Sequence, residues 1–316
     1  MCESTLRAFA FAVLLILAGH VQAWQPTKPL NIVVPSAVGS GNDVAFRPIS
    51  RAFEALKIPH VFEHIPGVGG AIATNYFKKS KKPDGHSLLI YGVGQYGAEL
   101  DYKDVVEYSY DDFVLVTQIA KTAVAILAKP NSPVGNVSEL LSDVRAGSRM
   151  IGTSSTVHPF IWNFLAEKTG LPKGNFHFVN YKAPPPQVID VGRGDLDYGT
   201  AALPAVLPFY GDGRINIVAV TSPRRMQGLP NVPAVSETIR GYEFVLEWGL
   251  VLPKGIGADI VQFYVETVSK IVLSKEAQDY FKANTLYIGE RDLGPKEYLR
   301  QIEKVRKQMG LAVAKQ

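Results

Sequence analysis

The feature that most constrains this chain is an apolar run that stops at a proline, crosses a glycine-containing loop and opens an amphipathic segment. It covers residues 31–44, with Pro35 at the stop. This order predicts a strand, a loop and a helix, with Asn42 or Asp43 as the helix cap. Because a helix start carries unpaired N–H donors and partial positive charge, the loop is a predicted anion site that suits phosphate or carboxylate.

The glycines of this loop can be compared with those of the dinucleotide-binding fingerprint, in which a similar loop also joins a strand to a helix. Gly39 and Gly41 supply the first two glycines, but Val44 stands where the third is required. The third glycine allows close packing of the helix on the strand. The incomplete pattern therefore disfavours a nucleotide cofactor, and no cofactor is expected.

The first 23 residues have the features of an export signal. An apolar run over residues 8–19 is too short to span a bilayer comfortably, and small residues follow it up to Ala23. We expect residues 1–23 to be a signal peptide cleaved near Ala23, which places the mature protein in the periplasm; an uncleaved anchor is the alternative. The single cysteine, Cys2, lies inside this segment, so the mature chain has no thiol for a disulfide or a thiolate metal site.

Length and charge narrow the class further. The chain has 316 residues, and what remains after the signal suits two modest domains better than one large one. The net charge of +4 comes from scattered lysines and arginines rather than from a basic stripe. Nucleic acid is therefore not an expected partner, whereas a small anion is compatible with this charge.

The unit of strand, loop and helix recurs along the chain. Strands are predicted at residues 60–64, 87–91, 176–181 and 215–221, and helices at 71–79, 137–145, 259–273 and 295–311. Extended segments at 113–129 and 248–253 are predicted to cross between two lobes, residues 24–122 with 246–316 and residues 123–245. We expect an α/β fold in which each lobe is a doubly wound sheet with flanking helices, and a ligand site at the carboxyl ends of the strands.

Motifs spread over nearly the whole mature chain occur in a familiar order. They are Val34-Pro35 with Gly39, Gly41 and Asp43; Pro66-Gly67; Asp84-Gly85; Ser155 with His158; Tyr181-Lys182; Leu229-Pro230; and Trp248-Gly249. As an ordered set they resemble the substrate receptors of the tripartite tricarboxylate transporter systems. The resemblance implies a monomeric periplasmic binding protein of the two-lobed, type II-like kind that closes on a small carboxylate and delivers it to a membrane permease, without catalysis.

The loops depart from that family at positions that should touch the ligand. Ser40 separates Gly39 from Gly41, Ser154 stands where a glycine is usual, and Ala183 replaces a glycine after Tyr181-Lys182. A serine adds a hydroxyl donor and removes backbone freedom. The ligand class therefore stays open among tricarboxylates, dicarboxylates, amino acids and aromatic acids.

The candidate ligand-binding residues lie in the predicted loops and at strand ends. They are Ser36, Ala37, Ser40, Asn42, Asp43, Gly92, Gln95, Thr153, Ser154, Ser155, Thr156, Tyr181 and Asp197. Asp43 would repel a carboxylate, which favours a capping role for it. Asp197, which we expect after a short strand that ends at Leu196, could face the cleft or only complete a turn.

Two other functions compete with solute delivery. A receptor of this kind could instead present its ligand to a membrane signalling protein. A periplasmic serine hydrolase would need Ser155 and His158 as a pair, but the nucleophile-elbow pattern fails because Thr156 stands where its second glycine belongs. His60 and His64 are predicted about 13 Å apart on one face of a strand, so no metal site is expected.

Overall fold

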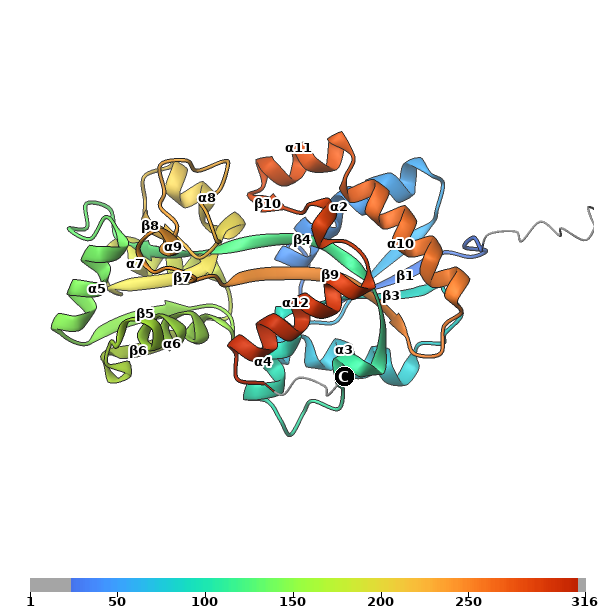
Figure 1. The fold of residues 1–316 in the computed structure, drawn as a ribbon, viewed down its shortest axis with the longest axis horizontal. Coiled ribbons are helices and arrows are strands. Elements are labelled where there is room, and N and C mark those ends of the chain that lie inside the picture. The colour runs from blue at the N-terminus through green and yellow to red at the C-terminus, as the bar shows by residue number, and fades with distance from the viewer. Residues whose placement is uncertain (1–23, 312–316) are drawn as a thin grey trace, which may run out of the picture.

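The computed structural model describes residues 24–311, which form two lobes side by side (Figure 1). The predicted signal peptide and its cleavage near Ala23 lie outside the described residues. Within residues 24–311, no helix has the length and the apolar composition needed to cross a membrane.

The first lobe is built from repeated units of strand, loop and helix. Its elements are β1 (Leu30–Val34), α2 (Gly41–Ala55), β2 (His60–His64), α3 (Ala71–Ser80), β3 (Ser87–Gly92), α4 (Val93–Asp101), α10 (Ala258–Val272), α11 (Lys275–Ala283), β10 (Leu286–Tyr287) and α12 (Pro295–Gln308). β1 pairs in parallel with β2 and with β3. The loops that follow these strands therefore share one edge of the sheet.

The second lobe repeats this arrangement. It contains α5 (Val137–Ala146), β5 (Arg149–Thr153), α6 (His158–Thr169), β6 (Phe176–Asn180), α7 (Pro184–Arg193), β7 (Tyr198–Ala202), α8 (Leu203–Gly211), β8 (Asn216–Val220) and α9 (Val235–Thr238). β5 pairs in parallel with β6 and with β7. The carboxyl ends of these strands also lie together, as the sequence predicted for a ligand-binding edge.

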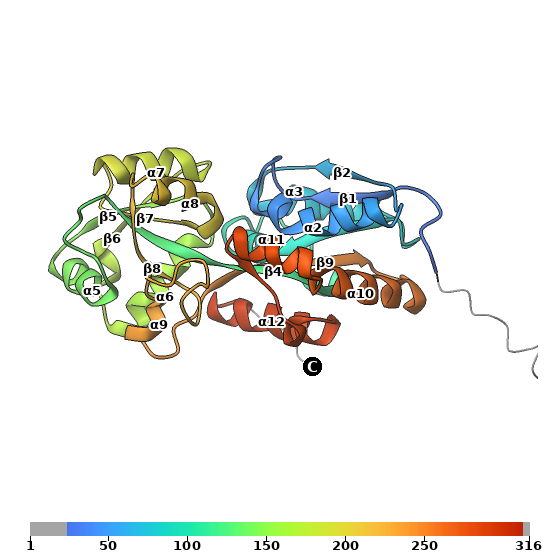
Figure 2. The same cartoon turned by 90° about the horizontal axis from the view of Figure 1, so that it is seen from above.

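Two long strands, β4 (Phe113–Ala128) and β9 (Val245–Pro253), run between the lobes (Figures 1 and 2). β4 pairs with β9 from Phe113 to Ala123, and with β7 and β8 beyond that point. The strand order β2-β1-β3-β9-β4-β7-β5-β6, with β8 and β10 also on β4, makes one ten-stranded sheet. The two-lobed α/β fold is confirmed, but the lobes share a mixed sheet because the crossing strands pair antiparallel to their neighbours.

The sequences of the two crossing strands are near-continuous apolar runs because both faces of these strands are buried. Every residue of β9 is buried, and so is β4 from Val116 onward. Helices α2 and α10 contact β4, and so does α12. A strand covered on both faces has no solvent side, so it lacks the alternation of apolar and polar residues that an exposed strand has.

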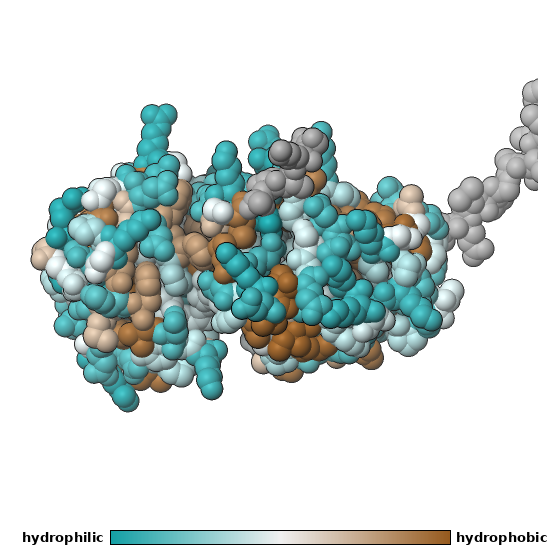
Figure 3. All heavy atoms as spheres, turned by 90° about the horizontal axis from the view of Figure 1, so that it is seen from below, coloured by the Kyte–Doolittle hydropathy of each residue, from teal (hydrophilic) through white to brown (hydrophobic). Residues whose placement is uncertain are grey.

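On the lower surface, mostly hydrophilic side chains cover the lobes and a notch separates them (Figure 3).

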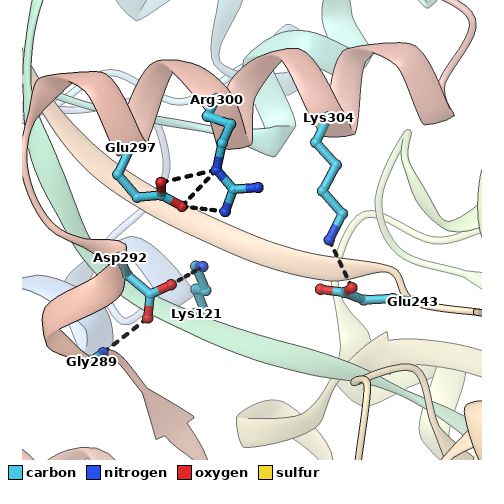
Figure 4. Close-up of polar contacts among 7 residues, drawn as sticks. All are labelled: Lys121, Glu243, Gly289, Asp292, Glu297, Arg300 and Lys304. Carbon is cyan, nitrogen blue, oxygen red and sulfur yellow. Dashed lines mark hydrogen bonds and ion pairs between the residues drawn. The ribbon is translucent and has the colours of Figure 1, made fainter.

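Helix α12 lies along the crossing strands and is tied to them by polar contacts (Figure 4). Lys304 Nζ contacts Glu243 Oε2 at 2.7 Å, just before β9 begins, and the Gln308 amide donates to the Glu243 carbonyl. In the turn that precedes α12, Asp292 Oδ1 contacts Lys121 Nζ on β4 at 2.7 Å. These contacts fix α12 over the point where the chain passes between the lobes.

Four of the observed helices were not predicted from the sequence. They are α4, α8, α11 and the short α9. The predicted strand at residues 87–91 is confirmed, but it turns directly into α4 at Gly92. Gly92 and Gln95 therefore belong to a strand-to-helix turn.

Candidate functional site

The first loop, residues 35–40, joins β1 to α2 and carries a small network of polar side chains. The hydroxyl oxygens of Ser36 and Ser40 lie 2.6 Å apart, and the Asn42 amide donates to Ser36 Oγ at 2.7 Å. The Ser40 N–H donates to the Ala37 carbonyl, which closes the turn. Four of the predicted site residues thus form one connected group at the start of α2.

The side chains of Asp43 and His64 both form hydrogen bonds with the backbone of the first loop. Asp43 Oδ2 accepts the Gly39 N–H at 2.5 Å, and His64 Nδ1 donates to the Ser36 carbonyl at 3.0 Å. The second carboxylate oxygen of Asp43 lies 3.7 Å from His64 Nε2 and has no hydrogen-bond partner in the described part of the chain. The arrangement makes Asp43 a residue that orders the loop.

The start of α2 keeps its N–H donors available. Ser40 occupies the cap position but makes no side-chain capping bond, and the helix begins at Gly41. The predicted caps, Asn42 and Asp43, instead lie inside the first helical turn, so that prediction is corrected. Because first-turn N–H groups have no partner inside a helix, this end can donate to an anion.

The second loop, residues 154–157, joins β5 to α6. Thr153, at the end of β5, is buried and donates its hydroxyl to the Asn180 side chain at 2.6 Å. The Ser155 hydroxyl accepts from the Val157 N–H at 3.5 Å, whereas Ser154 Oγ is buried without a partner within residues 24–311. No side chain caps α6. Loop two therefore also offers a helix start with hydroxyl groups beside it.

His158 closes the second loop and does not pair with Ser155. Its Nδ1 accepts the Ser154 N–H at 3.3 Å, and burial lowers the pKa of His158 to about 3. Its Nε2 has no hydrogen-bond partner among the described residues. The imidazole is thus neutral at pH 7 and bonded away from the Ser155 hydroxyl, which leaves the hydrolase alternative without its nucleophile and base pair.

A series of close contacts, the last of which is between the lobes, connects the two loops. A β-carbon at Gly41 would lie 2.9 Å from the Trp248 ring, so the indole packs on the first turn of α2. Trp248 pairs with Gly92 at the start of α4. Farther along α4, a β-carbon at Gly97 would lie 2.7 Å from Thr156 Oγ1. A continuous path of packed residues therefore runs from loop one through Trp248 and α4 to loop two.

Position 92 requires a glycine because β9 packs closely against the backbone there. A β-carbon there would lie 2.2 Å from the Glu247 carbonyl oxygen, so no larger residue fits without moving β9. Gln95 closes the same turn, since its side chain accepts from the Gly92 N–H and donates to the Ile90 carbonyl. The polar atoms of Gln95 are bonded within the first lobe, so it shapes the turn rather than presenting a free donor.

Two predicted residues of the second lobe have other partners. The Tyr181 hydroxyl donates to Asp190 Oδ2 at 2.5 Å, and burial together with Asp190 raises the pKa of Tyr181 to about 12. Asp197 precedes β7, and its side chain and N–H both bond the backbone of Met150 near the start of β5. The expected strand ending at Leu196 is wrong. Because Asp197 lies at the amino ends of these strands, it is at the edge opposite Thr153.

The start of α7, next to these loops, contributes little as an anion site. The helix begins with Pro184, Pro185 and Pro186 and has no side-chain cap. Proline has no backbone N–H, so the donors that a helix start normally offers are missing there. The first turn of α2 has no proline and that of α6 has one, Pro159, so both of these starts keep more N–H donors than α7 does.

Sequence reasoning missed three residues that shape the site. His64 was weighed only as a metal ligand, Trp248 was noted as a family motif and as part of the return strand but not as a residue of the site, and Gly97 was not considered. Each acts through a contact with a distant segment, respectively Ser36, Gly41 and Thr156. The Trp248-Gly249 pair was a visible motif, but nothing in its spacing indicates which loop the indole touches.

Comparison with known proteins gives a consistent set of similarities. A family model described as tripartite tricarboxylate transporter family receptor matches residues 46–285. The protein BugT of Bordetella pertussis is 26% identical over 265 residues, which cover 82% of this chain and 80% of that protein. The structure of R. palustris Rpa4515 with adipate is similar with a TM-score of 0.78 and 26% identity, over 92% of this chain and 99% of that one. The periplasmic binding protein BugD is similar in fold, with a TM-score of 0.75 and 22% identity, over 90% of this chain and 97% of that chain.

Proposed function

The chain belongs to the tripartite tricarboxylate transporter receptor family, and on that basis we propose that it captures a small carboxylate between its lobes and delivers it to a membrane permease. Membership makes it a periplasmic solute-binding protein rather than an enzyme. The carboxylate is proposed because Rpa4515, which resembles this chain over nearly its whole length, has adipate in its structure.

The observation that carries this proposal is that each lobe has an uncapped helix start in a loop that follows one of its parallel strands. The start of α2 has Ser36, Ser40 and Asn42 beside it, and the start of α6 has Ser154 and Ser155. Backbone N–H groups and hydroxyls stabilise a carboxylate without adding a formal positive charge. Two such ends suit a molecule with a carboxylate at one or both termini.

Closure of the lobes follows from this arrangement. We take the lobes as residues 24–122 with 246–316 and residues 123–245, and the change of β4 pairing partners after Ala123 supports that division. A ligand that contacts both loops has higher affinity for the closed arrangement, so binding shifts the population toward it. A permease that recognises the closed form would then accept only loaded receptor.

Calorimetric titration of the protein from Trp24 onward with adipate and other dicarboxylates tests the proposal. Asn42→Ala and Ser155→Ala should each weaken binding by about 1–3 kcal/mol, the range for a hydrogen bond to a charged group. Ser142→Ala is the matched control, because that hydroxyl bonds the Ser138 carbonyl on α5. Unchanged affinity in both loop variants would place the ligand elsewhere, and no binding of any carboxylate would refute the proposed function.

A further inference from the structure

A cavity of about 550 Å³ lies between the lobes at a place that includes neither of the two loops. One wall is the segment Ser222–Gly228 that follows β8, and the other is formed by α11 and β10, which face it in Figure 1. It adjoins a smaller cavity that reaches Leu207 on α8. Its volume is within the range of small-molecule sites.

The position of this cavity follows from the pairing of β4. In the first lobe β10 pairs with β4 at Lys121 and Thr122, on the edge opposite β9. In the second lobe β8 pairs with β4 from Ala125 to Ala128, on the edge opposite β7. Both walls of the cavity are therefore attached to β4 itself, whereas the two loops follow β1 and β5, which lie farther out in the sheet.

Both walls are fixed to β4 only two positions apart. The Thr122 hydroxyl donates to the Thr285 carbonyl at 2.8 Å, and the Val124 N–H donates to Thr221 Oγ1 at 2.9 Å. At its far side the Ser222–Gly228 segment is held by Arg225, which contacts Glu237 and the Pro230 carbonyl. The cavity is therefore a built feature of the hinge rather than a gap between loose loops.

The charge of the lining favours an anion. Arg225 is paired with Glu237, and Asp279 with Lys275. Arg224 and Lys282 also line the cavity, and neither makes an ion pair with any residue in the range 24–311. Two cations, one from each lobe, are left without an acidic partner.

The uncharged part of the lining is mixed, with polar groups from Ser222, Gln227, Gln278 and Thr285 beside an apolar wall. Met226 and Leu286 are buried against the cavity, and Tyr287 and Pro223 complete the wall. Burial raises the pKa of the Tyr287 hydroxyl, the carboxylates of Glu243, Asp292 and Glu247 add to this rise, and the Arg224 charge opposes it. An apolar wall beside unpaired cations suits a ligand with an anionic end and an apolar body.

We propose that this cavity is an accessory binding site for an amphipathic organic anion, a carboxylate that carries an apolar ring or chain. Arg224 and Lys282 bind the carboxylate, and Met226, Leu286 and Tyr287 contact the apolar part. The site stands independently of the proposed function of the two loops. Because its walls belong to different lobes, an occupant also fixes their separation and resists rotation about β4.

Titration calorimetry with 4-iodobenzoate tests the site, using the protein from Trp24 onward. The variant carrying Arg224→Ala and Lys282→Ala should bind about tenfold or more weakly, since it loses both charged partners. A variant carrying Arg240→Ala and Lys270→Ala removes the same charge from positions outside the cavity and should bind as the wild type does.

Crystals soaked in the same compound give the second readout. The iodine should produce an anomalous peak between Ser222–Gly228 and α11. Equal affinity of the wild type and the Arg224/Lys282 variant, an iodine peak only at the two loops, or binding at crystal concentration only would each overturn the proposal.

Discussion

Glu247 makes the stability of this protein depend on pH in a direction that can be calculated. The residue lies on β9 beneath α12 and is fully buried. Tyr96 Oη is 3.4 Å from one carboxylate oxygen, and the other has no hydrogen-bond partner in the described chain. Burial raises the pKa of Glu247 from 4.5 to about 7, although Lys121 on β4 and the side chains of Gln301 and Lys304 on α12 act to lower it.

The sign follows from proton binding in the two states. Between pH 4.5 and 7 the folded protein keeps a proton that the unfolded chain has released, so the free energy of unfolding falls as pH rises through this interval. At about 1.4 kcal/mol per pH unit the full effect is about 3 kcal/mol, of which about 2.5 kcal/mol falls between pH 5 and 8. Glu247→Gln has no carboxyl group to titrate and should lack this dependence.

Urea unfolding of the wild type and the Glu247→Gln variant at several pH values from 5 to 8 measures the effect. The variant's free energy of unfolding should rise relative to the wild type by about 2.5 kcal/mol across that range. Glu237→Gln is the control, because Arg225 lowers the pKa of Glu237 to about 2 and the group stays ionised throughout. A difference between Glu247→Gln and wild type that stays constant with pH, or that falls as pH rises, would refute the reasoning.

Two further predictions concern neighbouring residues of β9. Gly249→Ala should lower the free energy of unfolding by about 1–3 kcal/mol, because its β-carbon would lie 2.3 Å from the buried Tyr298 ring; Gly211→Ala, with open space around it, should change little in the same urea assay. Trp248→Phe should abolish the change in tryptophan fluorescence on ligand binding, because Trp162 is buried in the second lobe and Trp24 packs on His86 and Phe263. A ligand-dependent signal of wild-type size in that variant would show that Trp248 does not border the site.

Much of the fold could be predicted because the core strands and their loops follow local rules. The strand predicted at residues 60–64, the extended segment at 113–129 and the helix at 259–273 are each observed within one residue. Their apolar spacing arises from burial, which the sequence records directly. The loops that contain glycine and serine follow the carboxyl ends of parallel strands, as the predicted order of strands and helices required.

The helices that were missed have weak local signals. α4 contains Gly94 and Gly97, and α8 contains Pro204 and Pro208, residues that usually interrupt helices. α11 is short and mostly polar, with Ala277 and Phe281 as its buried residues. In each case tertiary contacts decide the structure, as where α4 packs closely on Thr156 and Val157.

The candidate site was predictable as a set of loops but not as a set of side-chain directions. Tyr181 directly follows β6 and Gln95 lies in the first turn of α4, yet both side chains form hydrogen bonds within their own lobe. The prediction for Asp197 was wrong because the residues just before β7 were taken for the turn after a short strand that ends at Leu196. Which hydroxyl in a serine-rich loop faces outward depends on partners such as Asn42 and His158, and these cannot be assigned from spacing alone.

The central claim, that the two loops form a receptor site for a small carboxylate, is tested most directly by a thermal-shift screen of the protein from Trp24 onward. The panel contains dicarboxylates and tricarboxylates, amino acids, aromatic acids, sugars and nucleotides. A ligand that binds only the native state must raise the melting temperature. The account predicts a rise with one class of carboxylate that is smaller in Ser155→Ala at the same ligand concentration. A rise with sugars or nucleotides and with no carboxylate would contradict it.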